Sequence, residues 1–149
     1  MAVGSLYYQG AKIIYMKKII LSITIFFFSF TTSATSIDFS SSSYSADVSV
    51  YVTSSSYAAD VSVHITSSSY SADKSVYIKR GYCGYKDKSV YITSSSYAAD
   101  KSIYFTSSSY AADVSVYITS SSYSADEEVC VSDDVSERDV IAALIGLDL

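Results

Sequence analysis

The sequence predicts an all-β domain built from tandem 13-residue repeats. Seven aspartates mark the repeat units, and their successive spacings are 13, 13, 14, 13, 13 and 13 residues: Asp47, Asp60, Asp73, Asp87, Asp100, Asp113 and Asp126. A fixed period indicates one supersecondary unit used many times, which cannot bury its apolar face alone. Each unit contains six alternating residues, as in Val48 to Thr53, and this alternation is typical of a strand with one buried face.

The expected strands cover residues 48–53, 61–66, 74–79, 88–93, 101–106, 114–119 and, as a closing half-strand, 127–131. Their first inward position is Val in some units and Lys or Glu in others, including Lys74, Lys101 and Glu127. We expect this position at the rim of the core, where a charged group can still reach water.

The connectors follow the pattern Ser-Ser-Ser-Tyr-x-Ala-Asp and, in the regular units, contain no Gly or Pro. Ser and Asp side chains can bond nearby backbone groups, so we expect the seven Asp carboxylates to accept backbone N–H bonds at the bends. We expect the connector tyrosines to lie over the edge of the core as an amphipathic cover. These are Tyr44, Tyr57, Tyr70, Tyr97, Tyr110 and Tyr123.

Two segments depart from the repeat. Residues 80–87 replace the Ser-rich connector and introduce Gly81 and Gly84, which predicts a reversal of the chain between two halves of three strands each. Residues 132–149 predict a short helix that is capped by Ser132 and carries an apolar stripe at helical spacing. We expect this helix to dock on the domain, and a partner-binding helix is the alternative.

The N-terminal region has the features of a secretory signal peptide. Met16-Lys17-Lys18 is positively charged, an apolar run follows from 19 to 30, and small residues allow cleavage after Ala34. The run is shorter than the roughly 20 residues of a membrane-spanning helix, and an uncleaved anchor is the alternative. Either Met1 or Met16 is the true start. The predicted organisation is an extension and signal peptide over 1–34, a seven-repeat domain over 35–131 and a helical tail over 132–149, in the periplasm or outside the cell.

The charge of the chain limits its partners. The 149 residues carry a net charge of −5, and the predicted signal region holds three lysines and no acid. Its removal leaves 7 basic against 15 acidic residues. Nucleic-acid binding needs clustered Lys and Arg, so we expect no nucleic-acid partner and, after signal cleavage, no attachment to a membrane.

The recurring pattern Tyr-x-Ala-Asp-x-x-Val-Tyr-Ile, with an irregular Gly-containing unit in the middle, resembles the 7(1) septoil knot domain family. Residues 57–63 and 97–103 match the motif well, and the resemblance covers residues 37–131. This is a family of small bacterial domains of unknown function. The resemblance implies interwound short-stranded β-sheets in a deep 7(1) torus knot. Periodicity alone would predict an ordinary solenoid.

We expect no catalytic centre, metal or cofactor. Calcium sites in repeat proteins need Gly-rich turns and several oxygens per ion, whereas each unit here offers one carboxylate. His64 takes a position that is Tyr in five other units, so a drifted repeat position explains it without a Ser–His–acid triad.

Cys83 and Cys130 are the two cysteines of the chain. In an oxidising compartment such a pair favours a disulfide. The bridge would close a loop of about 46 residues and contribute on the order of 4 kcal/mol. The alternative is a pair of free thiols, with Cys130 merely filling a Tyr position.

The outward strand faces repeat Ser-x-Tyr-x-Thr, and strands stacked about 4.8 Å apart would align these residues into ladders. The ladder residues are Tyr51, Tyr77, Tyr91, Tyr104, Tyr117, Thr53, Thr66, Thr93, Thr106 and Thr119. A regular array of this kind could bind a glycan or ice. Otherwise it is a soluble surface of residues that favour strands.

The sequence therefore predicts an exported, kinetically stable, non-enzymatic structural or binding module with an unknown ligand. A chain that must unthread in order to unfold should unfold slowly. The alternative is a self-associating surface or fibre-forming β-protein, because its strands are β-rich and uninterrupted by Pro.

Overall fold

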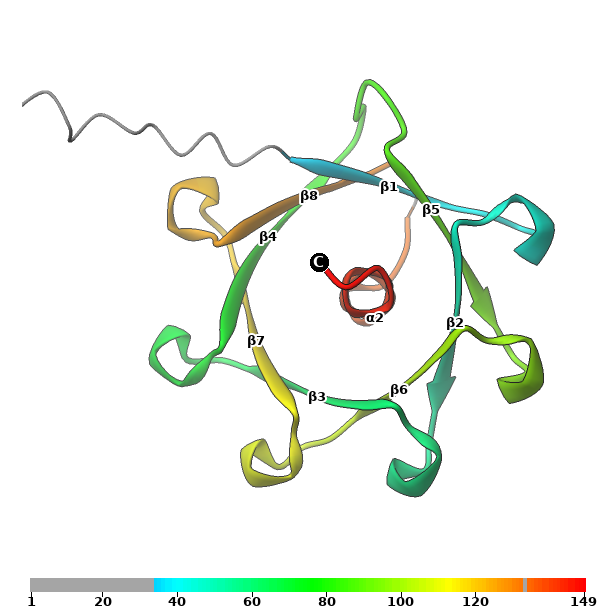
Figure 1. The fold of residues 1–149 in the computed structure, drawn as a ribbon. Helices are drawn as coiled ribbons and strands as arrows, with labels where there is room; N and C mark the ends of the chain where they lie inside the picture. Colours follow the sequence, from blue (N-terminus) through cyan, green and yellow to red (C-terminus); the bar gives the residue numbers. More distant parts are fainter. Residues whose placement is uncertain (1–33, 133) are drawn as a thin grey trace, which may run out of the picture. The chain divides into compact units, whose positions relative to one another are not determined.

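The computed structural model describes residues 34–132 and 134–149, which lie in one compact part of the chain, Thr32–Leu149 (Figure 1). The predicted signal peptide lies outside the described residues. The strands are β1 Thr35–Phe39, β2 Val48–Thr53, β3 Val61–Thr66, β4 Lys74–Arg80, β5 Lys88–Thr93, β6 Lys101–Phe105, β7 Val114–Thr119 and β8 Glu127–Val131. The α-helix, α2, covers Glu137–Gly146. All seven expected strands are present. β1 is an additional strand, although its sequence follows the same alternation.

The eight strands form one closed barrel, in the order β1-β5-β2-β6-β3-β7-β4-β8, and every neighbouring pair is parallel. Strands β1–β4, here called the first circuit, alternate around the barrel with β5–β8, the second circuit. The chain therefore passes round the barrel twice. The sequence suggested two halves of three strands each. Instead, each half supplies four strands to a single sheet, because β1 and β8 pair with each other and close the ring.

The pairing register indicates a wide barrel. Following paired residues once round the sheet returns to β2 displaced by about 16 residues. The familiar eight-stranded α/β barrel has a stagger of about 8 residues, and its own side chains fill its interior. A larger stagger tilts the strands further and widens the barrel. This barrel therefore needs more than strand side chains to fill its interior.

The helix α2 lies at the centre of the barrel (Figure 1). Four successive residues, Val140 to Ala143, are 0 % exposed, so the helix is buried on every side. An α-helix with side chains is about 10–12 Å across. The expectation that this helix docks on the domain is wrong in its placement, since it lies within the barrel. Its N-cap is also not Ser132 but Ser136, whose hydroxyl accepts the N–H of Asp139 at 3.1 Å.

The core combines this helix with one central residue from each strand. The eight strand residues are at most 1 % exposed: Ile37, Val50, Val63, Val76, Val90, Ile103, Val116 and Val129. They form one hydrophobic cluster with α2. The helix and β2 approach each other closely at Gly146, where an added Cβ would lie 2.4 Å from Cγ2 of Val50.

Three of the charged inward positions, Lys74, Lys101 and Glu127, lie half-buried at the rim, as expected, whereas Lys88 is exposed. Lys74 forms an ion pair with Glu127. Lys101 forms an ion pair with Asp148 and donates to the carbonyl oxygen of Ile145 at 3.3 Å. This carbonyl belongs to the last turn of α2, where a positive charge stabilises the helix dipole. A lysine in an inward position therefore holds the end of the central helix.

Candidate functional surface

Each of the seven recurring aspartates forms two hydrogen bonds with a serine on a neighbouring strand, and we call these the Asp–Ser pairs. In one pair, the N–H of Asp100 donates to the carbonyl oxygen of Ser49 at 2.8 Å, and the N–H of Ser49 donates to Oδ2 of Asp100 at 2.7 Å. The other six pairs are Asp47–Ser89, Asp60–Ser102, Asp73–Ser115, Asp87–Ser36, Asp113–Ser62 and Asp126–Ser75.

These bonds join distant parts of the chain. The carboxylates accept backbone N–H bonds, but the donors lie 42 or 51 residues away, not in the same bend as the sequence suggested. Each of these aspartates directly precedes a strand of one circuit and bonds a strand of the other, as where Asp87 precedes β5 and bonds β1. The Asp–Ser pairs therefore join the two circuits at every strand interface of the barrel except the one between β8 and β1.

Two of the carboxylates have a lowered pKa. Backbone and hydroxyl hydrogen bonds from Ser89, with a smaller contribution from the charge of Lys88, lower the pKa of Asp47. Hydroxyl and backbone hydrogen bonds from Ser75 lower the pKa of Asp126 in the same way, and Lys74 contributes less. Hydrogen bonds to the charged form are the cause in both cases. Such carboxylates are suited to holding structure, not to exchanging protons near neutral pH.

The Ser-rich connectors fold into short 3-10 turns. The turns are η1 Ser43–Ser45, η2 Ser56–Ala58, η3 Ser69–Ser71, η4 Ser96–Ala98, η5 Ser109–Ala111 and η6 Ser122–Ser124. The hydroxyl at the end of the preceding strand begins the connector, as where Thr53 accepts the N–H of Ser55 at 3.1 Å. Among the described residues, positive φ angles occur only at Gly81, Gly84 and Asp148. These turns therefore require no glycine.

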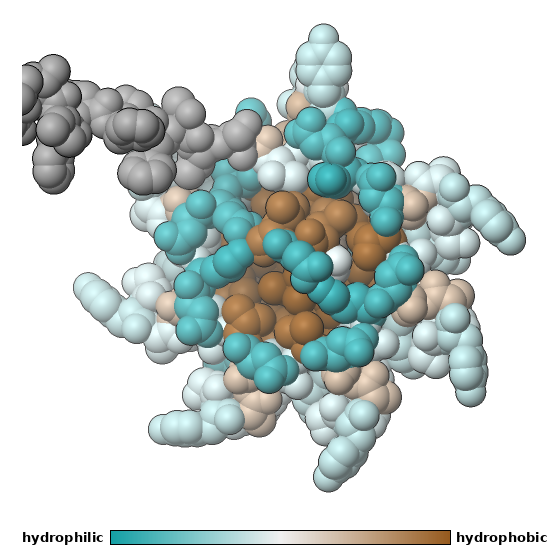
Figure 2. Space-filling model, in the orientation of Figure 1, coloured by the Kyte–Doolittle hydropathy of each residue, from teal (hydrophilic) through white to brown (hydrophobic). Residues whose placement is uncertain are grey.

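The tyrosine of each turn is fully exposed, and we call these six residues the tip tyrosines: Tyr44, Tyr57, Tyr70, Tyr97, Tyr110 and Tyr123. Their exposed fractions are 100–102 %. The expectation that they cover the core edge is wrong. Each of these connectors crosses the outside of an intervening strand, because α2 occupies the inside of the barrel. The 3-10 turn of the connector, which carries the tyrosine, therefore lies far from the core. Figure 2 shows the resulting arms, which radiate from a hydrophobic centre.

The expected ladders, in which tyrosines would lie beside tyrosines and threonines beside threonines on neighbouring strands, do not form. Tyr51 lies opposite Ser102 on one side and Thr93 on the other, because the strands are staggered. All five strand tyrosines are half-buried. The threonines accept connector N–H groups, namely at Thr53, Thr66, Thr93, Thr106 and Thr119. Their hydroxyls are thus engaged within the protein and do not form a free binding array.

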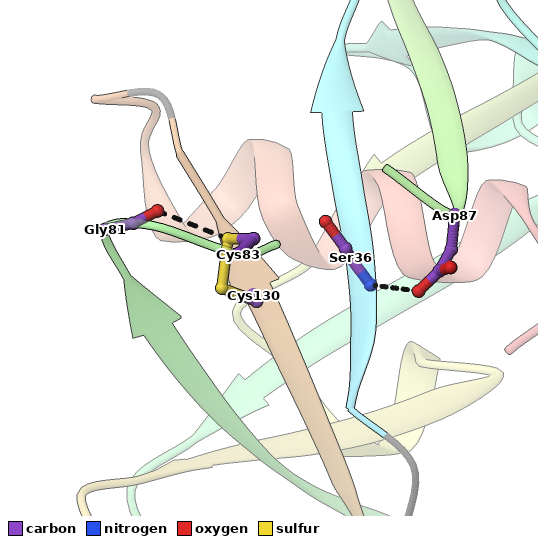
Figure 3. The surroundings of a disulfide bond; sticks show 5 residues. All are labelled: Ser36, Gly81, Cys83, Asp87 and Cys130. Atoms are coloured by element: carbon purple, nitrogen blue, oxygen red, sulfur yellow. Dashed lines mark hydrogen bonds between the residues drawn. A yellow bond between two sulfur atoms is a disulfide. The ribbon is translucent and has the colours of Figure 1, made fainter. Parts of the chain in front are cut away.

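The disulfide between Cys83 and Cys130 is present, with a Cα–Cα distance of 5.6 Å (Figure 3). Cys83 belongs to the central connector, residues 81–87, which joins β4 to β5. The predicted reversal of the chain is wrong, because β4 and β5 belong to one parallel sheet and the chain continues in the same sense. Gly81 and Gly84 have φ angles of +126° and +73°, which L side chains rarely adopt.

The central connector has to pass two strands, β8 and β1, where the other connectors pass one. It is attached to both of them. The disulfide holds it to β8. The pair Asp87–Ser36 holds it to β1 (Figure 3). An ion pair of 2.6 Å between Lys86 and Asp38 adds a second attachment to the same strand. The irregular sequence of this connector therefore corresponds to an irregular step in the barrel.

Within residues 34–132 and 134–149, no cluster of three or more His, Cys, Asp and Glu side chains has the arrangement needed to hold a metal ion. No helix in the described part of the chain has the length and apolar character needed to cross a membrane.

The main surface feature missed from the sequence is the exposure of the tip tyrosines. The only available sign was their position after three serines, in a segment without large apolar neighbours. A tyrosine in such a segment has nothing nearby to cover it. Connector composition was therefore a better guide than the general tendency of tyrosine to be partly buried.

Comparisons with known proteins identify the family. A family model described as the 7(1) septoil knot domain matches residues 34–125. A search of the curated proteins found no match, and a search of the solved structures found none either. The matched span begins just before β1 and ends just after η6, so it includes seven of the barrel strands and more than half of the chain. The chain therefore belongs to the 7(1) septoil knot domain family, whose function is unknown.

Proposed function

We propose that this chain is an exported, non-enzymatic scaffold that is held together by a deep 7(1) torus knot and presents its tip tyrosines to a binding partner. The observation that carries the proposal is the set of seven Asp–Ser pairs, which join the two circuits through residues 42 or 51 positions apart. The family match supports the knot.

Several features would make such a scaffold slow to unfold. The closed barrel leaves none of the described strands with a free edge from which unfolding could begin. The helix α2 fills the interior, and the disulfide joins the central connector to β8. Unfolding requires the loss of these long-range interactions and then unthreading of the chain. Resistance of this kind is a property of the unfolding rate.

The scaffold proposal is tested by unfolding kinetics and by digestion. The purified protein should unfold in concentrated guanidinium much more slowly than an unknotted domain of similar size, both with the disulfide intact and after its reduction. It should also survive a protease that cleaves the control domain. Digestion at the rate of the control would contradict the proposal.

The knot is tested by pulling the reduced chain from its two ends. The described 34–149 region, fully extended, would span about 400 Å. A tightened knot retains part of that length. The increase in end-to-end length on unfolding should therefore be smaller than for an unknotted chain. An unknotted control domain with the same number of residues should show the full increase in length. Full extension of the native chain would contradict the knot.

Export is tested separately. Expression of the full-length chain in a bacterium should yield a secreted or periplasmic form that begins after Ala34. The predicted cleavage site, and the disulfide between Cys83 and Cys130, support this part of the proposal. An intact N-terminus and retention in the cytoplasm would oppose it.

A second candidate function is self-association through the tip tyrosines. Six fully exposed rings at separate positions could contact several copies of the chain at once. Propagation of the sheet itself is not the route, because the described barrel has no free edge. Sedimentation distinguishes the two candidates: a discrete small species supports the scaffold, and large polydisperse material that is lost when the tip tyrosines become serine supports assembly.

A further inference from the structure

A shallow pocket lies beside the N-terminal turn of α2, where β3 and β6 end. Its lining residues are His64, Ile65, Phe105, Thr106, Ser107 and Arg138, and its volume is about 320 Å³. We call it the His64 pocket. It is separate from the tip tyrosines and plays no part in the function proposed above.

The His64 pocket contains two departures from the repeat. Among β2–β7, the fourth strand position is Tyr in every strand but β3, where it is His64. The fifth position is Val or Ile in every strand but β6, where it is Phe105. These two residues are far apart in the sequence, yet both line the same pocket. The chain thus differs from its own repeat at one place in the fold.

An equivalent pocket, one repeat further on, provides an internal comparison. It is lined by Tyr77, Ile78, Ile118, Thr119 and Ser120, with Arg80 and Glu137, and its volume is about 290 Å³. Here Tyr77 replaces the histidine and Ile118 replaces the phenylalanine. The helix contributes a carboxylate from Glu137, where the His64 pocket receives the guanidinium of Arg138. Two hollows of similar size therefore have different chemistry.

The groups of the His64 pocket are arranged to receive a ligand. The Cζ atom of Arg138 lies over the Phe105 ring, 4.5 Å from its centre. A guanidinium that stacks on an aromatic ring can still use its N–H edges for a ligand. None of the ion pairs in the described part of the chain includes Arg138. The Nδ1–H of His64 donates to the carbonyl oxygen of Thr106 at 3.1 Å, which leaves Nε2 for another partner.

Two apolar side chains, Ile65 and Phe105, also line the His64 pocket. Ile65 is 37 % exposed, although it occupies an inward-facing repeat position, and the Phe105 ring lies beside it in the lining. A cation with free N–H edges between apolar walls fits a planar carboxylate attached to an apolar body, because Arg binds carboxylates through two parallel N–H bonds. An inorganic anion would make no apolar contact with Ile65 and Phe105. The overall acidity of the chain also disfavours a polyanion.

We infer that the His64 pocket binds a small organic carboxylate. The carboxylate lies against the N–H edges of Arg138, with the hydroxyl of Ser107 as a further donor, and the His64 ring forms part of the wall. The apolar body of the ligand lies between Ile65 and Phe105. The site requires no metal and no covalent step.

The test is a titration of the disulfide-bonded protein with benzoate, followed by backbone amide NMR. Saturable shifts should be centred on Thr106 and Ser107. Arg138→Gln should weaken binding about 10-fold or more, because a charge-assisted pair is lost. His64→Tyr and Phe105→Ile should also weaken it, and both introduce the residue that the other repeats already contain. These variants should therefore fold.

Matched controls separate the alternatives. Arg80→Gln, in the equivalent pocket, should leave benzoate binding unchanged. Benzamide, which has the same shape without the charge, should bind much more weakly. Equal binding of benzamide would show an apolar hollow only, and equal binding of inorganic phosphate would show a general anion site. Either result, an unaffected Arg138→Gln variant, or the absence of saturable shifts would overturn the inference.

Discussion

Replacing Gly146 with alanine tests whether α2 is an integral part of the barrel core. Gly146 ends the helix, and an added Cβ would lie 2.4 Å from Cγ2 of Val50 and 3.8 Å from its Cβ. The first distance is far inside van der Waals contact. Val50 is β-branched, so its side chain has few alternative rotamers in which to avoid the new methyl group. The helix or the strand must therefore shift.

Two opposing effects determine the size of the change. Gly→Ala within a helix normally stabilises by about 1 kcal/mol. Overpacking of a close-packed core costs about 1–3 kcal/mol. Because the steric conflict is deep and the partner is stiff, the second effect should prevail, and Gly146→Ala should lower the free energy of unfolding by about 1–2 kcal/mol. Val50→Ala alone should cost about 2–3 kcal/mol through lost burial and the cavity it leaves.

The double variant Gly146→Ala/Val50→Ala tests whether the clash with Val50 causes the loss of stability. With Val50 shortened, the methyl group added at position 146 has space, so the two changes should be coupled by at least about 1 kcal/mol. Val63 takes the same position in β3 as Val50 in β2 and provides the control: Gly146→Ala/Val63→Ala should be additive. Guanidinium unfolding, approached from both folded and unfolded protein, gives the free energies. A Gly146→Ala variant as stable as the parent, or more stable, would refute the packing of α2 against β2.

The other predictions concern the Asp–Ser pairs, acid stability, the disulfide and the tips. Asp100→Ala leaves a buried backbone N–H without its acceptor and should cost about 1.5–3 kcal/mol in guanidinium unfolding. Asp100→Asn retains a carbonyl oxygen and should cost less, so equal losses would contradict the assigned bond. The folded pKa values of Asp47 and Asp126 lie below the ordinary value of 3.8. The two ionised carboxylates therefore stabilise the folded protein fully above pH 3.8, and this stabilisation disappears as the pH falls through the folded pKa. The melting temperature should fall between pH 5 and pH 2, and it should fall less in a variant in which both residues are Asn. Reduction of the disulfide, which spans 47 residues, should lower the unfolding free energy by about 4 kcal/mol, whereas an unchanged value would argue against the bridge in solution. Tyr57→Ser at a tip should change stability by less than about 0.5 kcal/mol, and a larger loss would mean that the ring packs on the protein.

The strands could be predicted because their local pattern is strong. Alternation placed the strands correctly, and the charged first position correctly indicated the rim. The register could not be predicted in the same way. Because the strands are near copies, sliding one of them by a whole repeat presents almost the same face, so no local pattern distinguishes one partner from another. Which strand pairs with which depends on how the whole chain winds around the barrel, and the local sequence of a strand does not encode that path.

The placement of α2 and the composition of the His64 pocket could not be predicted from local sequence either. The apolar stripe from Val140 to Ile145 predicted one buried face, while Ala142, Ala143 and Gly146 were the sign that every face is packed. Small residues on the second face of a helix make it fit a narrow space. The His64 pocket depends on Arg138 and on residues from two different repeats, so only the folded chain brings them together.

The alternation of the two circuits has a consequence for the order of synthesis. No first-circuit strand pairs with another first-circuit strand, and each pairs only with strands of the second circuit. The nearest partner of β2 is β5, about 40 residues later, and a ribosome adds roughly 5–20 residues per second. For several seconds the emerging half of the protein therefore has no partner with which to form a sheet. A cell that makes this chain has to keep the first half soluble until the second half begins to appear, because sheet formation cannot start before β5 has been made.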